Sequence, residues 1–128
     1  MSSKSIVIVS LLTTVDIPVS PANVKVPPVL NVSLSPESAE SVKLAAKDII
    51  SQSDEIDVLI NNAGMLLTAP FLLTKIDDIK LMFEVNFFSQ LIFSQIIIKK
   101  MIRKKSGSII NISSTSGIEG NEGRLGYS

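Results

Sequence analysis

A long helical pattern between two short apolar runs restricts the fold of this sequence more than any other feature. The runs occupy residues 56–60 and 108–113, and the helical pattern extends over residues 75–105. Strand, helix and strand in this order form the βαβ unit of a parallel sheet, whose crossover is nearly always right-handed. Ligands of such sheets bind at the carboxyl ends of the strands. The residues that follow the two runs are therefore the first candidates for a functional site.

The amino-terminal half continues the same alternation. Residues 6–9 and 29–32 are short apolar runs that predict two further strands, and residues 36–52 have the apolar face of a helix. Four prolines within residues 13–28 remove backbone donors and predict irregular chain there. We therefore expect residues 1–128 to form a single α/β domain, an incomplete doubly wound parallel sheet.

The ends of the two predicted helices carry local signals. Ser35 followed by Pro36 predicts the N-cap and the first position of the shorter helix. Thr74 with Asp77 three residues later predicts a capping box at the start of the long helix, and Gly107 predicts its end.

The long helix is apolar over most of its circumference. Ile79, Phe83, Phe87 and Leu91 form one stripe, and further apolar residues widen it. Such a helix needs burial on two sides, which predicts a homo-oligomer through residues 75–105. Lys and Arg residues gather at its carboxyl end, where cations interact favourably with the helix dipole. We expect a solvated helix end there rather than a contact with nucleic acid.

Composition excludes several classes of function. The chain has no cysteine and no histidine, which excludes disulfides, thiolate nucleophiles, imidazole bases and the usual zinc sites, and no metal site is predicted. Twelve Lys and Arg balance twelve Asp and Glu, so the charge gives no indication of nucleic-acid binding. The apolar stretches are too short to predict a membrane span, and no cleavage site follows the one near the amino terminus. We therefore expect a soluble cytoplasmic protein without nucleic-acid or membrane partners.

Polar residues follow the 56–60 strand and interrupt the long helix. Residues 61–64 read Asn-Asn-Ala-Gly. The amides can tie neighbouring strands together, and Ala-Gly leaves bare backbone that a flat ligand can approach. Alternatively, the Asn and Gly residues only supply positive φ for a turn. Asn86 lies in the long helix and must find partners there, as a ligand of water or backbone or as an ordinary buried amide.

Hydroxyl groups follow the second strand of the unit. Ser113 and Ser114 stand at the end of the 108–113 strand, and Tyr127 comes thirteen residues after Ser114. Together these side chains could converge on a substrate. Each of them alone is better explained as structural, because serine and glycine favour loops.

In combination, these segments resemble the short-chain dehydrogenase/reductase family. Residues 56–64 (IDVLINNAG) resemble its strand with the Asn-Asn-Ala-Gly motif, and residues 83–86 (FEVN) resemble the helical segment with its catalytic asparagine. Residues 107–114 (GSIINISS) resemble the strand that ends in its catalytic serine, for which Ser114 is the better match. Tyr127 falls where the family has its tyrosine. The spacings are similar to those of bacterial 3-oxoacyl-ACP reductases.

The resemblance implies a partial Rossmann-like, NAD(P)-binding domain. It implies hydride transfer between a nicotinamide cofactor, NAD or NADP, and a small-molecule carbonyl or alcohol substrate, such as a 3-oxoacyl thioester. In this family pattern Tyr127 is the general acid/base, Ser114 holds the substrate oxygen, and Asn86 orders a water of the proton relay. The residues that the resemblance places at the cofactor are Asn31, Val32, Asn62, Ala63 and Gly64.

Two departures from the family pattern bear on activity. The glycine-rich phosphate turn is absent, because the first glycine of the chain is Gly64, so residues 6–9 fit the family's second strand better than its first. The family's lysine lies four residues after the tyrosine, whereas Tyr127 is followed only by Ser128. We therefore expect a truncated reductase with weak or no activity. The alternatives are a non-catalytic interaction or dimerisation module derived from this fold, and a truncated product without a stable function.

Overall fold

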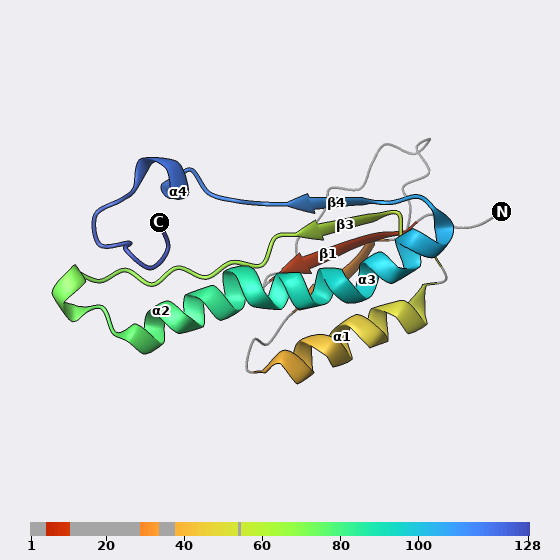
Figure 1. Cartoon of the computed structure of the whole chain (residues 1–128), viewed down its shortest axis with the longest axis horizontal. Coiled ribbons are helices and arrows are strands. Elements are labelled where there is room, and N and C mark those ends of the chain that lie inside the picture. Colours follow the sequence, from red (N-terminus) through yellow and green to blue (C-terminus); the bar gives the residue numbers. More distant parts are fainter. Residues whose placement is uncertain (1–4, 11–28, 34–37, 54) are drawn as a thin grey trace.

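The computed structural model describes residues 5–10, 29–33, 38–53 and 55–128 and shows a parallel sheet packed against helices (Figure 1). The strands are β1 (Ile6–Ser10), β2 (Val29–Ser33), β3 (Val58–Asn61) and β4 (Ser108–Asn111). They lie in the order β2-β1-β3-β4, and every neighbouring pair is parallel. The predicted α/β class and the four predicted strands are confirmed, although β3 starts two residues later and β4 ends two residues earlier than expected.

β1 lies inside the sheet and not at the position expected for it. It pairs with β2 along one edge and with β3 along the other. In a doubly wound sheet of order 3-2-1-4-5-6 this is the position of the first strand, so the assignment of residues 6–9 to the second strand is wrong. Val7 of β1 and Leu59 of β3 are both fully buried. The two strands therefore need each other's backbone hydrogen bonds as well as their apolar contact.

The helices fall close to their predicted positions. They are α1 (Ala39–Gln52), the 3₁₀-helix η1 (Phe71–Leu73), α2 (Ile76–Phe83), the π-helix η2 (Glu84–Ser89), α3 (Gln90–Lys104) and the short α4 (Ser116–Glu119). α2, η2 and α3 follow one another without a break, so the predicted helix over residues 75–105 is one long helix with a π-helical turn inside it. Such turns are rare and frequently mark functional sites.

Both helices begin differently from the sequence prediction. The N-cap of α1 is Ser38, and Ser35 and Pro36 lie outside the described residues. At the long helix Lys75 is the N-cap and makes no side-chain cap. The Thr74 hydroxyl lies within hydrogen-bond distance of two preceding backbone carbonyls instead, so the predicted capping box is wrong.

The long helix ends at a residue other than glycine. Lys105 adopts the left-handed conformation with φ 57°, and Ser106 N–H donates to the Met101 carbonyl at 3.2 Å. This is the usual pattern of a helix end with a left-handed cap. Gly107 is needed for another reason, because a Cβ atom there would lie 2.5 Å from Cγ of Met101.

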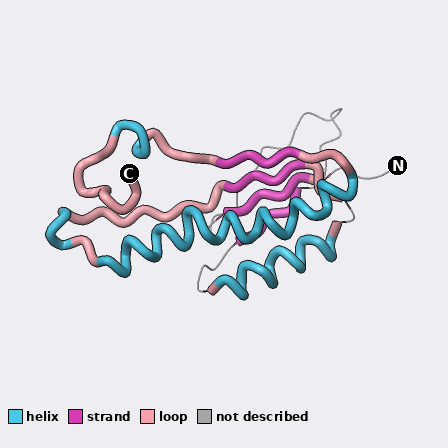
Figure 2. Tube along the Cα trace, in the orientation of Figure 1, coloured by secondary structure: helices cyan, strands magenta, loops and turns pink. Residues whose placement is uncertain are grey.

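α1 and α3 lie side by side on one face of the sheet and enclose the core (Figure 2). The sheet contributes Val7 and Leu59. The helices contribute Val42, Ala46 and Ile49 from α1 and Phe93, Ile97 and Met101 from α3. Burial of these apolar side chains is the main favourable term in the stability of the domain.

The long helix turns one side to the sheet and the other to solvent. Most of its buried residues recur at steps of three or four: Met82, Val85, Ser89, Phe93, Ile97 and Met101. Gln90, beside Ser89, is buried as well. The predicted stripe lies on the other side, where Phe83, Phe87 and Leu91 remain 44 to 54 % exposed. The helix is therefore apolar on two sides, as predicted.

By length and composition, the helix from Ile76 to Lys104 could also cross a membrane. Phe93 and Ile97 are fully buried in the cluster that α3 forms with the sheet and α1. This is the environment of a core helix, which passes the same test of length and composition.

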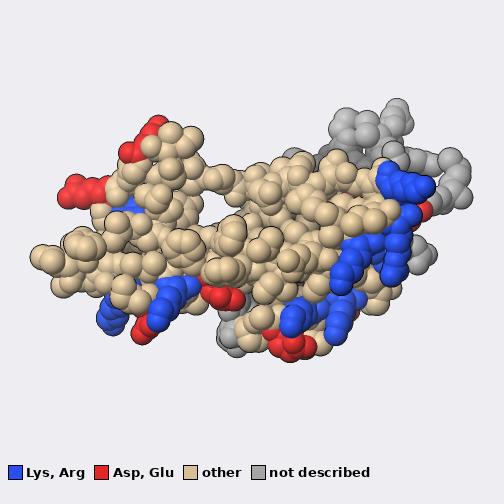
Figure 3. All heavy atoms as spheres, viewed as in Figure 1, with Lys and Arg blue, Asp and Glu red and all other residues tan. Residues whose placement is uncertain are grey.

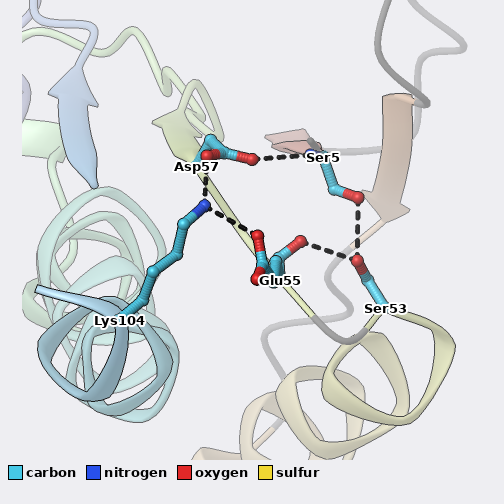
Figure 4. Close-up of polar contacts among 5 residues, drawn as sticks. All are labelled: Ser5, Ser53, Glu55, Asp57 and Lys104. Carbon is cyan, nitrogen blue, oxygen red and sulfur yellow. Dashed lines mark hydrogen bonds and ion pairs between the residues drawn. The ribbon is translucent and has the colours of Figure 1, made fainter. Parts of the chain in front are cut away.

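A polar network closes the end of the sheet at which the strands begin (Figure 4). Lys104 Nζ lies 3.0 Å from Glu55 Oε2 and 2.5 Å from Asp57 Oδ1. Asp57 Oδ2 accepts a hydrogen bond from Ser5 N–H at 2.9 Å, and the hydroxyls of Ser5 and Ser53 are 2.8 Å apart. The network therefore joins the chain before β1 and β3 to the ends of α1 and α3.

Other cations at the carboxyl end of α3 lie at the surface (Figure 3). Lys99, Arg103 and Lys105 are exposed, in keeping with the predicted solvated helix end. Lys104 differs from them because its side chain is only a quarter exposed and is paired with two carboxylates.

The pKa of Lys104 is raised above its ordinary 10.5, mainly by its hydrogen bonds to Asp57 and Glu55. A raised lysine pKa stabilises the fold while the group is charged in both states, and this contribution is lost as the pH rises through the folded-state pKa. We expect Lys104→Met to lower the urea midpoint at neutral pH. The difference from wild type should disappear at pH values above the folded-state pKa. Urea unfolding followed by circular dichroism at both pH values measures it.

Lys99→Met is the matched control, because Lys99 is exposed on the same helix. An equal loss in this control would contradict the assignment, as would a loss in Lys104→Met that does not depend on pH.

Candidate functional site

The segments that follow β3 and β4 continue beyond the sheet (Figure 2). They border a cleft of about 360 Å³. The cleft lies beyond the carboxyl ends of these strands, where parallel sheets bind their ligands. Six of the eight predicted site residues line it: Asn62, Ala63, Gly64, Asn86, Ser114 and Tyr127. The structure thus brings together residues from three separate parts of the sequence.

The backbone after β3 is bare where it borders the cleft. Gly64 has no positive φ, and in the described part of the chain Lys105 is the one residue other than glycine with positive φ. The alternative that residues 61–64 only supply positive φ for a turn is therefore wrong. A Cβ atom on Gly64 would meet only Asn86 Oδ1, at 3.9 Å, an ordinary contact. The protein itself does not require glycine here, and the missing side chain leaves room for a ligand against the backbone.

Asn86 lies in the π-helical turn, and its side chain binds the segment that follows β3. Its Oδ1 accepts a hydrogen bond from Met65 N–H at 2.7 Å, and its Nδ2 donates to the Met65 carbonyl at 3.0 Å. Asn86 is therefore a ligand of the backbone, one of the roles that the sequence allowed. Both polar atoms of its side chain are engaged by one residue, which fixes the distance between the loop and the helix.

Gln90 is a second amide at the cleft, and the sequence analysis missed it. It begins α3, is 9 % exposed, and donates through Nε2 to the Ala63 carbonyl. The signal that could have found it is an amide four positions after Asn86 in a largely apolar helix, because residues at this spacing lie close together on a helix.

Ser114 and Tyr127 border the cleft from the segment after β4. Ser114 Oγ accepts a hydrogen bond from Ser116 N–H at 3.2 Å, which orients the hydroxyl. Tyr127 is held by a turn, in which its N–H donates to the Arg124 carbonyl at 2.9 Å. The preceding Gly126 packs closely on the long helix, since a Cβ atom there would lie 2.4 Å from Cε of Met82.

Asn31 and Val32 lie in β2, near its carboxyl end. β1 separates β2 from β3, which puts about 10 Å between these two strands. Val9 of β1 pairs with both Val32 and Asn61, so β2 and β3 are level across the sheet. The two residues therefore lie at the same carboxyl edge of the sheet beyond which the cleft opens.

Asn61 ties neighbouring elements together, as predicted for the amides of this motif. It is 1 % exposed, and its Nδ2 donates to Ser94 Oγ at 2.9 Å and to Asn111 Oδ1 at 2.8 Å. The side chain thus links β3 to α3 and β4. It fixes the start of the loop that borders the cleft.

A second hollow, the α3–β4 groove, opens beside Asn61 with a volume of about 610 Å³. Its walls are mainly apolar and include Phe87, Leu91 and Ile98 of the long helix. Asn61 Oδ1 is buried and has no hydrogen-bond donor among the described residues. A group in the groove that carries a donor would satisfy this oxygen.

The described residues that line the cleft include no Asp, Glu, Lys or Arg. Its polar groups are the hydroxyls of Ser113, Ser114 and Tyr127, the amides of Asn62, Asn86 and Gln90, and backbone. Such a site can bind a neutral polar group and exchange a proton through a hydroxyl. It suits a carbonyl or alcohol and a flat ligand on the bare backbone.

Known proteins share this sequence and fold. The family described as short chain dehydrogenase matches residues 23–128. A 3-oxoacyl-[acyl-carrier-protein] reductase of Aquifex aeolicus is 37 % identical over 91 residues, which are 71 % of this chain and 37 % of that protein. An acetoacetyl-CoA reductase of an Acinetobacter species is 33 % identical over 89 residues, 70 % of this chain and 36 % of that protein.

A solved structure, that of ElxO with NADP bound, superposes with a TM-score of 0.67 at 28 % identity and covers 77 % of this chain and 40 % of its own. The chain therefore spans between a third and two fifths of the length of these relatives. The family match covers most of the chain and includes every strand except β1. The chain belongs to the short chain dehydrogenase family.

Proposed function

We propose that this chain contributes the site of an NAD(P)-dependent oxidoreductase that transfers a hydride between a nicotinamide cofactor and a carbonyl or alcohol group. The observation that carries the proposal is the convergence of Asn86, Ser114 and Tyr127 with the bare Asn-Ala-Gly backbone in one cleft. The NADP bound by ElxO and the reductase activities named for the relatives support it. When bound, the cofactor would supply or accept the hydride.

The hydroxyls of Ser114 and Tyr127 have different roles at the substrate oxygen. Ser114 Oγ already accepts from Ser116 N–H, so its own proton is the one that it offers to the substrate oxygen. Tyr127 donates the proton that the reduced carbonyl needs and takes it back in the reverse direction. We assign the cofactor to the backbone of Asn62, Ala63 and Gly64, with Asn31 and Val32 at the far end of the same sheet edge.

Asn86 orders the water of the proton relay in this proposal. Its side-chain amide is engaged by Met65, so its main-chain carbonyl is the better ligand for that water. In a π-helical turn, the return to α-helical bonding leaves a carbonyl without an intrahelical donor, and Asn86 lies inside that turn.

We infer that the substrate is a 3-oxoacyl thioester. Two relatives are named as reductases of such compounds. Met65 and Leu66 line the cleft beside the bare backbone, and Leu66 is 41 % exposed. These side chains offer an apolar surface to an acyl chain while the hydroxyls bind its carbonyl.

We further propose a cytoplasmic homo-oligomer that forms through the long helix. Phe83, Phe87 and Leu91 lie exposed on the side of the helix away from the sheet, next to the α3–β4 groove. Contiguous apolar surface of this kind marks an interface with another protein.

Cofactor titration tests the proposed function. Polypeptide 1–128 should bind NADPH or NADH saturably, with a Kd of about 1 mM or higher because no glycine-rich turn holds the pyrophosphate. Gly64→Leu should weaken this binding at least about tenfold, since the added side chain enters the cleft without a clash inside the protein. Isothermal titration or nicotinamide fluorescence measures both.

Ser106→Leu is the control, because Ser106 is exposed at the opposite end of α3. Equal binding by Gly64→Leu and wild type would place the cofactor elsewhere. No binding by either protein would favour the non-catalytic interaction module.

A further inference from the structure

We infer that Gln90 is a positioning residue that orients the peptide between Ala63 and Gly64 and so sets the affinity of the cleft for the cofactor. The inference rests on the proposed function, because it concerns the backbone to which the cofactor is assigned. It begins from a single contact: Gln90 Nε2 donates to the carbonyl of Ala63.

This contact fixes a direction as well as a position. In a trans peptide, the carbonyl of one residue and the N–H of the next point to opposite sides. The structure contains no cis peptide bond in its described part. Because Gln90 draws the Ala63 carbonyl toward the helix, the N–H of Gly64 must point away from Gln90. Gln90 therefore aims the donor of Gly64, the residue whose bare backbone borders the cleft.

Packing alone does not explain glutamine at this place. Gln90 is 9 % exposed, and its neighbours on the buried side of the helix include Val85, Phe93 and Ile97. A buried amide costs free energy unless it is hydrogen-bonded, so an apolar residue would fill the space at lower cost. The Gln90 amide makes a hydrogen bond to the Ala63 carbonyl that an apolar residue could not make.

Gln90 and Asn86 act on adjacent parts of one loop. Asn86 binds the N–H and the carbonyl of Met65, and Gln90 binds the carbonyl of Ala63. Asn86 lies in the π-helical turn and Gln90 directly follows it, and the two amides hold the backbone on either side of Gly64. Gly64 thus has a fixed orientation although it lies in a loop.

The experiment follows the Gly64 amide in ¹⁵N–¹H spectra of polypeptide 1–128 during titration with NADP⁺. Gln90→Met keeps the length of the side chain and removes the donor. We expect its Gly64 resonance to move before NADP⁺ is added, and the Kd for NADP⁺ to rise about tenfold, the upper range for one neutral hydrogen bond. Gln52→Met is the matched control, since Gln52 is exposed on α1 and donates to Asp48.

Gln90→Glu separates orientation from packing. Its carboxylate has the shape of the amide but no donor at neutral pH, whereas its protonated form can donate to the Ala63 carbonyl. Burial raises a carboxyl pKa above about 4.3, so NADP⁺ binding and the Gly64 resonance should return toward wild type on acidification. Among the described residues that line the cleft and the α3–β4 groove, Tyr127 is the one titratable member, so the acid titration reports the new carboxyl.

An unchanged Gly64 resonance and Kd in Gln90→Met would overturn the inference. A loss in Gln90→Glu that does not depend on pH would overturn it too, because it would show a packing effect. If wild type binds no NADP⁺, the proposed function fails, and the positioning of Gly64 is decided by the resonances of the variants alone.

Discussion

Phe93→Ala is expected to destabilise the protein by about 3–5 kcal/mol, the usual cost of removing a fully buried aromatic side chain. Phe93 is 0 % exposed and is the largest fully buried side chain in the described part of the chain. It lies in the cluster that joins α3 to α1 and the sheet. Small domains have only about 5–15 kcal/mol of stability in total, so a large part of the variant should be unfolded. Urea or thermal unfolding followed by circular dichroism measures the loss.

Phe71→Ala is the matched control for this prediction. Phe71 lies in η1 and is 72 % exposed, so the same change in chemistry should cost little there. Similar losses for the two variants would contradict the described core.

Polypeptide 1–128 is expected to reduce a 3-oxoacyl thioester no faster than its own Tyr127→Phe variant. Ordinary enzymes turn over about 1–1,000 times per second, so the expected deficit is about a thousandfold or more. A phenol in water is ionised to only about one part in a thousand at neutral pH. A neighbouring cation increases that fraction, and the part of the cleft lining that the structure describes contains no Lys or Arg. The pyrophosphate of the cofactor also lacks a glycine-rich turn, because the first glycine is Gly64.

The assay follows the loss of nicotinamide absorbance with NADPH and with NADH. Turnover of about 1 per second or faster that Tyr127→Phe abolishes would show that the described cleft is sufficient for catalysis. Binding of the cofactor without turnover is the result that the structure leads us to expect.

Local patterns predicted the elements and most of the site. Periodicity of apolar residues located α1 and the long helix, because burial of one face leaves a regular pattern in the sequence. Short continuous apolar runs located the four strands. The rule that ligands bind at the carboxyl ends of parallel strands then placed Asn62 and Ser114 near each other, and the resemblance to the family added Tyr127. The cleft confirms that these residues come together, while their roles stay predictions.

Features that depend on long-range contacts were not predictable in this way. β1 was assigned to the wrong position because strand order follows from which edges are free in the folded sheet, and no local pattern records it. The capping box at Thr74 failed because its hydroxyl is turned toward the backbone carbonyls of Ala69 and Pro70. Gln90 was missed because an amide in a helix is recognisable as a ligand only when its partner, the Ala63 carbonyl, is known.

The π-helical turn lets the long helix carry one residue more than a regular α-helix of the same shape. After it, the buried residues Ser89, Phe93, Ile97 and Met101 recur at steps of four, which is wider than the 3.6 residues of an α-helical turn. η2, between Glu84 and Ser89, takes up one surplus residue in a single wide turn. If this segment became regular α-helix with all its residues kept, α3 would rotate by about 100° against α2. Phe93 and Ile97 would then leave the core, so the wide turn keeps the two halves of the helix aligned with one sheet.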